Sequence, residues 1–319
     1  MPRTSLGRTL AIANPASHSG RGAGAADELE GLFASDPSLA GSFELRRTSG
    51  PGDAASIASS AGGFDTLLVM GGDGVINEAV NGLMRLPRER RPTLAVIPMG
   101  SGNDFARTLG LSLNHPREAL SQLASGERRA IGLGLVTSDA GESRHFAQTL
   151  SFGLDAAIAL DTTDRRAAQT SQEGAALFAT SGLKVFSTGG RGFPAYASFD
   201  GGEPMRLRVM VFAVQNGPTY GGGFRICPTA CPADHTLCVC HNVLQPRLPH
   251  TLALFALARF GLHTRSKVLR TVHVSRLEIR FEEGEPPCQA DGERVRGTSF
   301  HVESVPDALD VIVPKGCRW

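Results

Sequence analysis

The spacing of apolar residues divides the chain into two parts that meet near residue 140. In the first part, short apolar runs alternate with stretches of helical spacing. The runs that read as strands cover residues 10–13, 43–48, 66–70, 94–97 and 128–136. Repeated strand–helix alternation is typical of a parallel, doubly wound α/β sheet. We therefore predict an α/β domain over residues 1–138.

The second part is dominated by short strand-like runs, which Gly, Pro and Asp turns separate. These runs cover residues 145–150, 196–199, 207–215, 237–243, 272–281 and 295–302. Helical patterns interrupt them near residues 167–187 and 252–262. This pattern predicts an antiparallel β-sandwich, which we place at residues 139–302. Whether residues 303–319 return to the first domain is left open by the periodicity.

Composition and charge narrow the class of protein. The 319 residues are 41% hydrophobic and 20% charged, which is ordinary for a soluble globular chain. A net charge of +1 gives no support for binding nucleic acid. The N-terminus lacks an apolar run of signal-peptide length, and the run at 252–262 is too short to cross a bilayer. We expect a cytoplasmic protein.

Four of the six cysteines fall within fourteen residues; His235 lies among them and His241 directly follows the last. The spacing C-x3-C-x6-C-x-C is unlike the usual zinc-binding motifs. Cys238 and Cys240 also alternate along a strand, as two small buried side chains on one face would. Reduced thiols in the core are therefore favoured over a zinc site, which stays the alternative.

Two glycine-rich turns are the main indication of chemistry. Residues 71–78 read GGDGVINE and residues 98–107 read PMGSGNDFAR, each between an apolar strand pattern and a helical one. Glycines let backbone N–H groups approach an anion, and the helix N-terminus adds a positive dipole. If the two strands are neighbours in one parallel sheet, both turns face one ligand. The sequence therefore predicts a phosphate-binding site.

Several segments, in order along nearly the whole chain, resemble the catalytic domain of the diacylglycerol kinase family. This family includes sphingosine and ceramide kinases and bacterial lipid kinases. The matching segments are the two glycine turns, NPASHSG from Asn14, GPGDA after Thr48, YGGGFRICPTACPADHTL from Tyr220, and QADGE ending at Glu293. The resemblance implies an NAD kinase- or phosphofructokinase-like first domain and transfer of the γ-phosphate of ATP, with Mg²⁺, to a lipid hydroxyl. It does not identify the lipid.

The resemblance also implies roles for individual residues. The residues expected to bind the nucleotide are Asn14, Pro15, Ser19, Gly20, Thr48, Gly71, Gly72, Asp73, Gly74, Val75, Asn77 and Ser101. Asp73 is expected near the metal-bound phosphates, Asp155 near the reacting phosphate, and Glu293 as the general base.

Magnesium is expected at two places by the same resemblance. Asp104 is expected in a magnesium–water network. Asp234, with the carbonyls of Cys231 and Thr236, is expected to hold a second, structural Mg²⁺, because hard oxygen ligands suit this ion.

Plainer interpretations compete with these roles. The glycines could serve turn geometry alone, Asn77, Asn103 and Asp104 could be helix caps, and Asp291-Gly292 is a good hairpin dipeptide that would make Glu293 a hairpin residue. We favour the catalytic interpretation of Asp73, because an acid among backbone amides makes most sense beside a metal-bridged phosphate.

Two departures from the family pattern leave an alternative function open. Val75 replaces a threonine of the usual GGDGT, and His235 replaces a glycine that follows the family's aspartate. Both are compatible with a non-catalytic nucleotide- or lipid-binding regulator. An NAD kinase or phosphofructokinase is disfavoured by the GSGNDFAR run, and a nicotinamide dehydrogenase by the lack of G-x-G-x-x-G. The expected partner is a lipid at a membrane surface, bound transiently and peripherally; a homodimer stays open.

Overall fold

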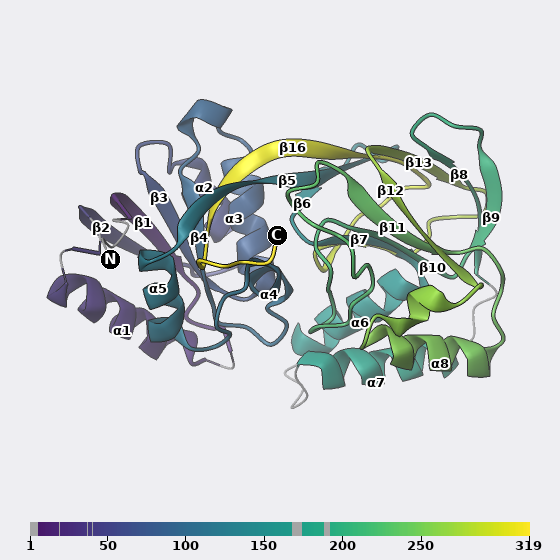
Figure 1. The fold of residues 1–319 in the computed structure, drawn as a ribbon, viewed down its shortest axis with the longest axis horizontal. Coiled ribbons are helices and arrows are strands. Elements are labelled where there is room, and N and C mark those ends of the chain that lie inside the picture. The colour runs from purple at the N-terminus through teal and green to yellow at the C-terminus, as the bar shows by residue number, and fades with distance from the viewer. Residues whose placement is uncertain (1–5, 19, 37, 40, 168–173, 188–191) are drawn as a thin grey trace. The chain divides into compact units, whose positions relative to one another are not determined.

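The computed structural model describes residues 6–18, 20–36, 38–39, 41–167, 174–187 and 192–319 (Figure 1). The chain forms two compact units: Met1–Ile131 with Asp307–Trp319 make unit 1, and Gly132–Pro306 make unit 2. Unit 1 has a parallel α/β sheet and unit 2 has antiparallel sheets. The two fold classes expected from the sequence are thereby confirmed.

The sheet of unit 1 has the strand order β2-β1-β3-β4, all parallel. Its strands are β1 (Arg8–Ala13), β2 (Ser42–Arg47), β3 (Thr66–Gly71) and β4 (Thr93–Pro98). Every residue of β3 and β4 is buried, as their unbroken apolar runs require. In their register Gly71 lies opposite Pro98, so the turns that follow start side by side.

Helices cover both faces of this sheet (Figure 1). They are α1 (Gly22–Ser35), α2 (Asp53–Ser59), α3 (Asp73–Leu83), the 3₁₀ turn η1 (Arg88–Arg90), α4 (Asp104–Leu109) and α5 (Pro116–Ala124). Close packing of α2 on α3 depends on Gly82, where a Cβ atom would lie 2.3 Å from the Ala55 carbonyl oxygen. The end of the last strand, β16 (Ser299–Val313), also lies in this unit, where Val311 pairs with Leu94 in parallel.

Unit 2 contains two sheets with a shared apolar core. The first sheet joins β5 (Glu127–Ser138), β6 (Ser143–Phe146), β8 (Phe193–Phe199), β9 (Met205–Val209), β13 (Arg276–Phe281) and the first part of β16. The second has the order β12-β11-β10-β7-β14-β15. Its strands are β7 (Thr149–Gly153), β10 (Val211–Gln215), β11 (Leu237–Asn242), β12 (Leu269–Val274), β14 (Cys288–Ala290) and β15 (Glu293–Arg294). Phe152 of one sheet meets Phe281 and Phe300 of the other, which makes the unit a β-sandwich.

A layer of helices packs on the outer face of the second sheet (Figure 1). It consists of α6 (Leu154–Ala167), α7 (Gly174–Ser187), α8 (Leu248–Ala258) and the 3₁₀ turn η2 (Leu262–Arg265). The helix predicted at 252–262 is shorter at its C-terminal end than expected, because the chain leaves α8 and Gly261 takes a left-handed conformation with φ of 73°. No helix in the described ranges is long and apolar enough to span a bilayer.

Three of the strands predicted as single runs are each two separate strands in the structure, and the two strands belong to different sheets. The prediction was therefore wrong at these three places. The run 145–150 divides into β6 and β7, 207–215 into β9 and β10, and 272–281 into β12 and β13. At each break, a remote side chain accepts the free backbone N–H groups. Asp291 bonds the amides of residues 147–149, Asn242 those of residues 210–211, and Asp200 those of residues 275–276.

Candidate functional site

The two glycine turns of unit 1 pack directly on each other. A Cβ atom on Gly100 would lie 2.5 Å from the Cα of Gly72, so this approach excludes any side chain there. The amide of Met99 donates to the Gly71 carbonyl oxygen at 2.8 Å and fixes their register. The turns therefore present adjacent stretches of bare backbone at the carboxyl ends of β3 and β4.

Asp73 connects the two turns chemically. It is the first residue of α3, and its half-buried carboxylate accepts a hydrogen bond from the amide of Phe105 in α4 at 3.3 Å. The predicted catalytic acid thus lies at the start of one helix and bonds to the start of another. The structure therefore brings Asp73 to the second turn, although its role in catalysis stays a prediction.

The second turn is held by a pair of asparagines. Asn103 is buried in a left-handed conformation, with φ of 55°, and its amide nitrogen donates to the Gly100 carbonyl at 2.7 Å. Asn114 accepts hydrogen bonds from Asn103 and from the amide of Gly100. The Oδ1 atom of Asn103 is buried without a hydrogen-bond partner, so this turn has an unused acceptor. Sequence analysis missed Asn114, since a single loop asparagine carries no periodic signal.

Next to it, Asp104 is buried as the first residue of α4, with Arg107 Nε at 3.8 Å from its carboxylate. Ser101 is half-buried. Asp73 and Asp104 therefore begin the two helices that follow the two turns. This is where carboxylates could hold a cation that also binds phosphate.

Gly74 and Gly71 differ in what surrounds them. No atom would lie within 4 Å of a Cβ on Gly74, whereas a Cβ on Gly71 would come to 3.0 Å from the Cβ of Val75. Packing thus explains why residue 71 is a glycine, but it does not explain why residue 74 is one. Val75 fills the space beside Gly71, and Asn77 is buried with its side-chain oxygen bonded by Asn81.

The first predicted nucleotide turn follows β1. The amide of Asn14 donates to the Met70 carbonyl at 3.1 Å, and the amide of Thr48 donates to the Ala13 carbonyl at 2.9 Å. These bonds place both residues at the end of the sheet from which the glycine turns start. Pro15 and Gly20 continue this turn, and Gly20 has φ of 87°. Ser19 lies outside the described residues.

In unit 2, Glu293 lies in a hairpin between β14 and β15. Asp291 and Gly292 form its two-residue loop, both with positive φ (48° and 91°), which is the type I′ geometry. Asp291 accepts hydrogen bonds from the amides of Ala147, Gln148 and Thr149 at 2.7–3.1 Å. Glu293 is exposed and makes no side-chain hydrogen bond to another described residue. The hairpin interpretation is thus geometrically correct, and the role of Glu293 as a base stays a prediction.

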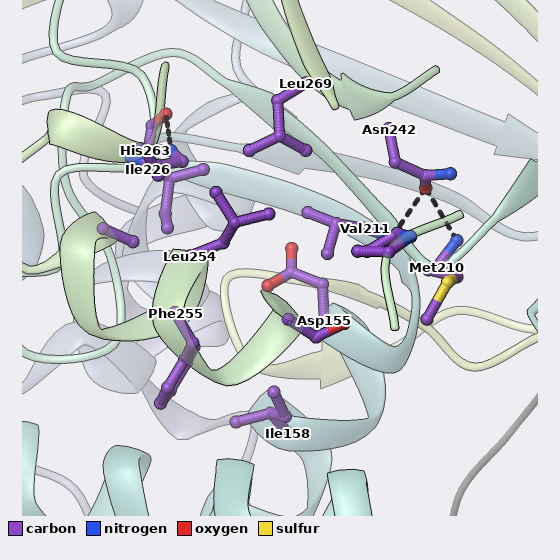
Figure 2. Close-up of a pocket in the computed structure, with 13 residues that line it drawn as sticks. Asp155, Ile158, Met210, Val211, Ile226, Asn242, Leu254, Phe255, His263 and Leu269 are labelled. Carbon is purple, nitrogen blue, oxygen red and sulfur yellow. Dashed lines mark hydrogen bonds between the residues drawn. The ribbon is translucent and has the colours of Figure 1, made fainter. Parts of the chain in front are cut away.

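Asp155 lies at a pocket between α6, α8 and the second sheet (Figure 2). The cavity has a volume of about 50 Å³ and is mostly apolar. The residues that line it are Asp155, Ile158, Met210, Val211, Ile226, Asn242, Pro246, Thr251, Leu254, Phe255, Ala258, His263 and Leu269. Figure 2 shows the Asp155 carboxyl pointing toward Leu254 and Val211.

The chemistry of Asp155 follows from its burial. Desolvation raises the pKa of its carboxyl to about 8, the nearby Cys240 adds to this increase, and a hydrogen bond with Ser151 opposes it. Its Oδ2 atom has no hydrogen-bond partner. At neutral pH Asp155 is therefore mostly protonated, and an apolar pocket acquires one group able to donate a hydrogen bond.

The second predicted magnesium site lies in an exposed turn of unit 2. His235 takes the left-handed conformation, with φ of 58°, where the family pattern has glycine. The amide of Asp234 donates to the Cys231 carbonyl at 3.1 Å, and Thr236 Oγ1 lies 3.4 Å from His273 Nδ1. His235 thus takes a backbone conformation that glycine adopts readily. Within the described residues, no three His, Cys, Asp or Glu side chains gather as a metal site.

Three of the clustered cysteines belong to the packing beneath the helices. Cys227, Cys238 and Cys240 are buried in one apolar cluster together with Phe178 and Ala258, and all six cysteines are free thiols. Cys227 donates to the Cys238 carbonyl oxygen at 3.3 Å. This is the packing expected for reduced core thiols.

Comparison with known proteins gives a consistent picture. Residues 8–136 match the diacylglycerol kinase catalytic domain, and residues 148–313 match the YegS C-terminal NAD kinase beta sandwich-like domain. The chain is 29% identical over 281 residues to a protein of Serratia proteamaculans named "Probable lipid kinase YegS-like", covering 86% of each chain. A protein of the same name from Yersinia enterocolitica is 27% identical over 286 residues, covering 86% of this chain and 88% of that one.

Two solved structures share the fold. A diacylglycerol kinase from Bacillus anthracis superposes with a TM-score of 0.76 at 24% identity, covering 97% of each chain. An NAD kinase from Archaeoglobus fulgidus, solved in complex with ATP, gives 0.53 at 16% identity, covering 97% of this chain and 95% of that one. At these identities the likeness establishes the fold alone, while the two domain matches establish the family. The chain belongs to the family that joins a diacylglycerol kinase catalytic domain to a YegS-type C-terminal β-sandwich domain.

Proposed function

We propose that this protein transfers the γ-phosphate of ATP to the hydroxyl of a lipid in a magnesium-dependent reaction. The observation that carries the proposal is the contact of Gly72 with Gly100, which joins the two glycine turns into one backbone surface at the carboxyl ends of β3 and β4. Phosphoryl transfer depends mainly on positioning and charge neutralisation, which such a surface supplies.

On the nucleotide side, unit 1 fits a hydrated cation bound to phosphates. Magnesium in such sites uses one or two carboxylates together with water and phosphate oxygens, so Asp73 and Asp104 meet its needs without a third acid. The unpartnered Oδ1 of Asn103 offers a further acceptor for bound water. When bound, the ion neutralises charge on the phosphates. Asp73 keeps the start of α4 in place through its bond to Phe105.

On the acceptor side, unit 2 offers an apolar pocket with one neutral acid. An acyl chain would occupy the apolar wall formed by Leu254 and Phe255, and the protonated Asp155 would donate to a lipid oxygen. A cavity of about 50 Å³ is too small for a long chain, so we expect α8 to shift when lipid enters. Glu293, whose carboxylate is exposed and uncommitted, is proposed to accept the hydroxyl proton.

The test is transfer of label from γ-labelled ATP to a panel of diacylglycerol, sphingosine, ceramide and phosphatidylglycerol. At least one labelled lipid is expected with Mg²⁺ and none in the presence of a chelator. Nucleotide binding without transfer to any of the four, with a control kinase active, would support the regulator instead. The panel also identifies the lipid.

A further inference from the structure

One face of α8 is apolar and exposed. Ala253, Ala256 and Leu257 follow at spacings of three and one residues, which places them along one side of the helix, and Phe260 follows in the turn directly after α8 ends at Ala258. Leu257 is 40% exposed and Phe260 70% exposed. Leu262, which follows the turn at Gly261, is 40% exposed as well. We call these five residues the α8 face.

The opposite side of the same helix is apolar too. Thr251, Leu254, Phe255 and Ala258 line the pocket that contains Asp155. A helix that is apolar on both sides is normally buried all round, in a protein core or in lipid. On α8, one side packs on its own unit and the other meets solvent, so the α8 face has the character of a surface that something covers.

The stretch of chain that contains the α8 face carries a net positive charge. Residues 235–277 contain no Asp or Glu but six Lys or Arg: Arg247, Arg259, Arg265, Lys267, Arg270 and Arg276. Arg225 lies beside the face, because its amide donates to the Ala258 carbonyl at 2.9 Å and its Cβ would lie 3.5 Å from a Cβ on Gly261. In the described part of the chain, none of these seven cations forms a salt bridge.

We propose that the α8 face docks onto the surface of a bilayer that contains anionic phospholipid. Exposed Phe and Leu side chains would enter the boundary between headgroups and acyl chains, while Arg225, Arg265 and Lys267 would meet the lipid phosphates. A second copy of this chain is a poorer occupant, because a two-fold contact through this face would bring the same cations together. The proposal deepens the proposed function: it puts the pocket on the inner side of α8 next to the source of lipid.

Vesicle flotation without nucleotide tests the docking, and it does not depend on whether the protein is a kinase. The intact protein should float with vesicles of equimolar phosphatidylcholine and phosphatidylglycerol and bind pure phosphatidylcholine at least about tenfold more weakly. Raising the ionic strength from about 0.1 M to about 1 M should weaken binding, because the screening length falls from about 10 Å to about 3 Å.

Two pairs of variants locate the surface. Leu257→Ser with Phe260→Ser, and separately Arg265→Glu with Lys267→Glu, should each lower the vesicle partition coefficient at least about tenfold. The matched controls are Met205→Ser, a 39% exposed side chain on β9, and Arg85→Glu with Arg90→Glu in unit 1, which should bind as wild type does. Unchanged thermal midpoints would show that the variants fold.

Equal binding by Leu257→Ser/Phe260→Ser and by wild type would overturn the proposal. It would also be overturned by a concentration-dependent dimer in sedimentation that this double variant abolishes, because a second copy would then cover the face. Activity on a short-chain diacylglycerol in detergent micelles should survive in the double variant. If the double variant no longer floats but keeps that activity, docking is separate from catalysis. If the protein floats but is inactive on every lipid, the docking proposal holds and the proposed kinase function is contradicted.

Discussion

At the scale of single residues, Asp73 has a structural and a proposed catalytic task that mutation can separate. Asp73→Ala removes the bond to the Phe105 amide, which should cost about 0.5–1.5 kcal/mol of unfolding free energy. If Asp73 also supports metal-bound phosphates, the rate of transfer should fall roughly 100-fold or more. Rates at saturating ATP and thermal unfolding of the same samples measure the two effects.

Asp65→Ala is the control for this prediction. Asp65 accepts hydrogen bonds from the Arg8 backbone and side chain and directly precedes β3, at the opposite end of the strand from the glycine turn. Its loss should lower stability with little change in rate. If Asp73→Ala stays within a few-fold of wild type, Asp73 belongs to turn geometry alone.

Asp155 should make stability depend on pH. Its native pKa is about 8 against 3.8 for the free group, so between these values the folded protein holds a proton that the unfolded chain has released. Its contribution to unfolding free energy is therefore full below about pH 4 and is lost as pH rises toward 8, by up to about 1.4 kcal/mol per pH unit. Asp155→Asn should remove this slope.

Denaturant unfolding across that pH range measures the effect. The asparagine variant should match wild type near pH 4 and exceed it near pH 8. Parallel curves for the two proteins would mean that Asp155 is not buried in its neutral form.

At the scale of single residues, the sequence could predict the features that depend on backbone conformation. Glycines that approach one another at Gly72 and Gly100, and the left-handed His235, occur where motif and turn chemistry required them. The pocket around Asp155 could not be predicted. Its lining comes from two helices, one 3₁₀ turn, three strands and several loops that are far apart in sequence, and no local pattern shows that they meet.

At the scale of elements, the β14–β15 hairpin separates a structural acid from a proposed base. Asp291 holds three backbone amides, whereas Glu293 points to solvent two residues later. Glu293→Gln should therefore leave the hairpin, the thermal midpoint and ATP affinity unchanged. Removal of a general base should lower kcat by about 100- to 10,000-fold.

Asp291→Ala is the contrasting change in the same hairpin. It leaves three amides at the β6–β7 break without their acceptor, so it should lower the thermal midpoint clearly. If Glu293→Gln turns over as fast as wild type, Glu293 is only a hairpin residue, and the base must be sought elsewhere.

The three divided strands show why element boundaries escaped the sequence. Around Met210 the chain is apolar without a break from residue 209 to residue 214, and at Ser275 and Arg276 two polar residues follow each other, but neither pattern specifies a change of sheet. The acceptors that make each break possible, Asn242 and Asp200, lie 32 and 75 residues away in the chain. The local sequence therefore indicates that a strand is present, but it does not indicate which sheet the strand joins.

At the scale of the whole molecule, the division into α/β and β parts was predictable because it changes the period of the entire pattern. Burial of β3 and β4 on every residue follows from their unbroken apolar runs. The helix layer over the second sheet was only partly predicted, since α6 begins at Leu154, thirteen residues before the expected start at 167.

The central claim is that the glycine turns hold the phosphates of ATP, and Gly74→Ala tests it most directly. Because a Cβ at Gly74 meets no atom within 4 Å, alanine costs the fold nothing and should stabilise α3 by up to about 1 kcal/mol. Gly31→Ala in α1, equally open, is the control. Measured by thermal unfolding and ATP titration, both variants should be at least as stable as wild type, and only Gly74→Ala should bind ATP at least about tenfold more weakly. Wild-type ATP affinity in the stabilised Gly74→Ala variant would contradict the account.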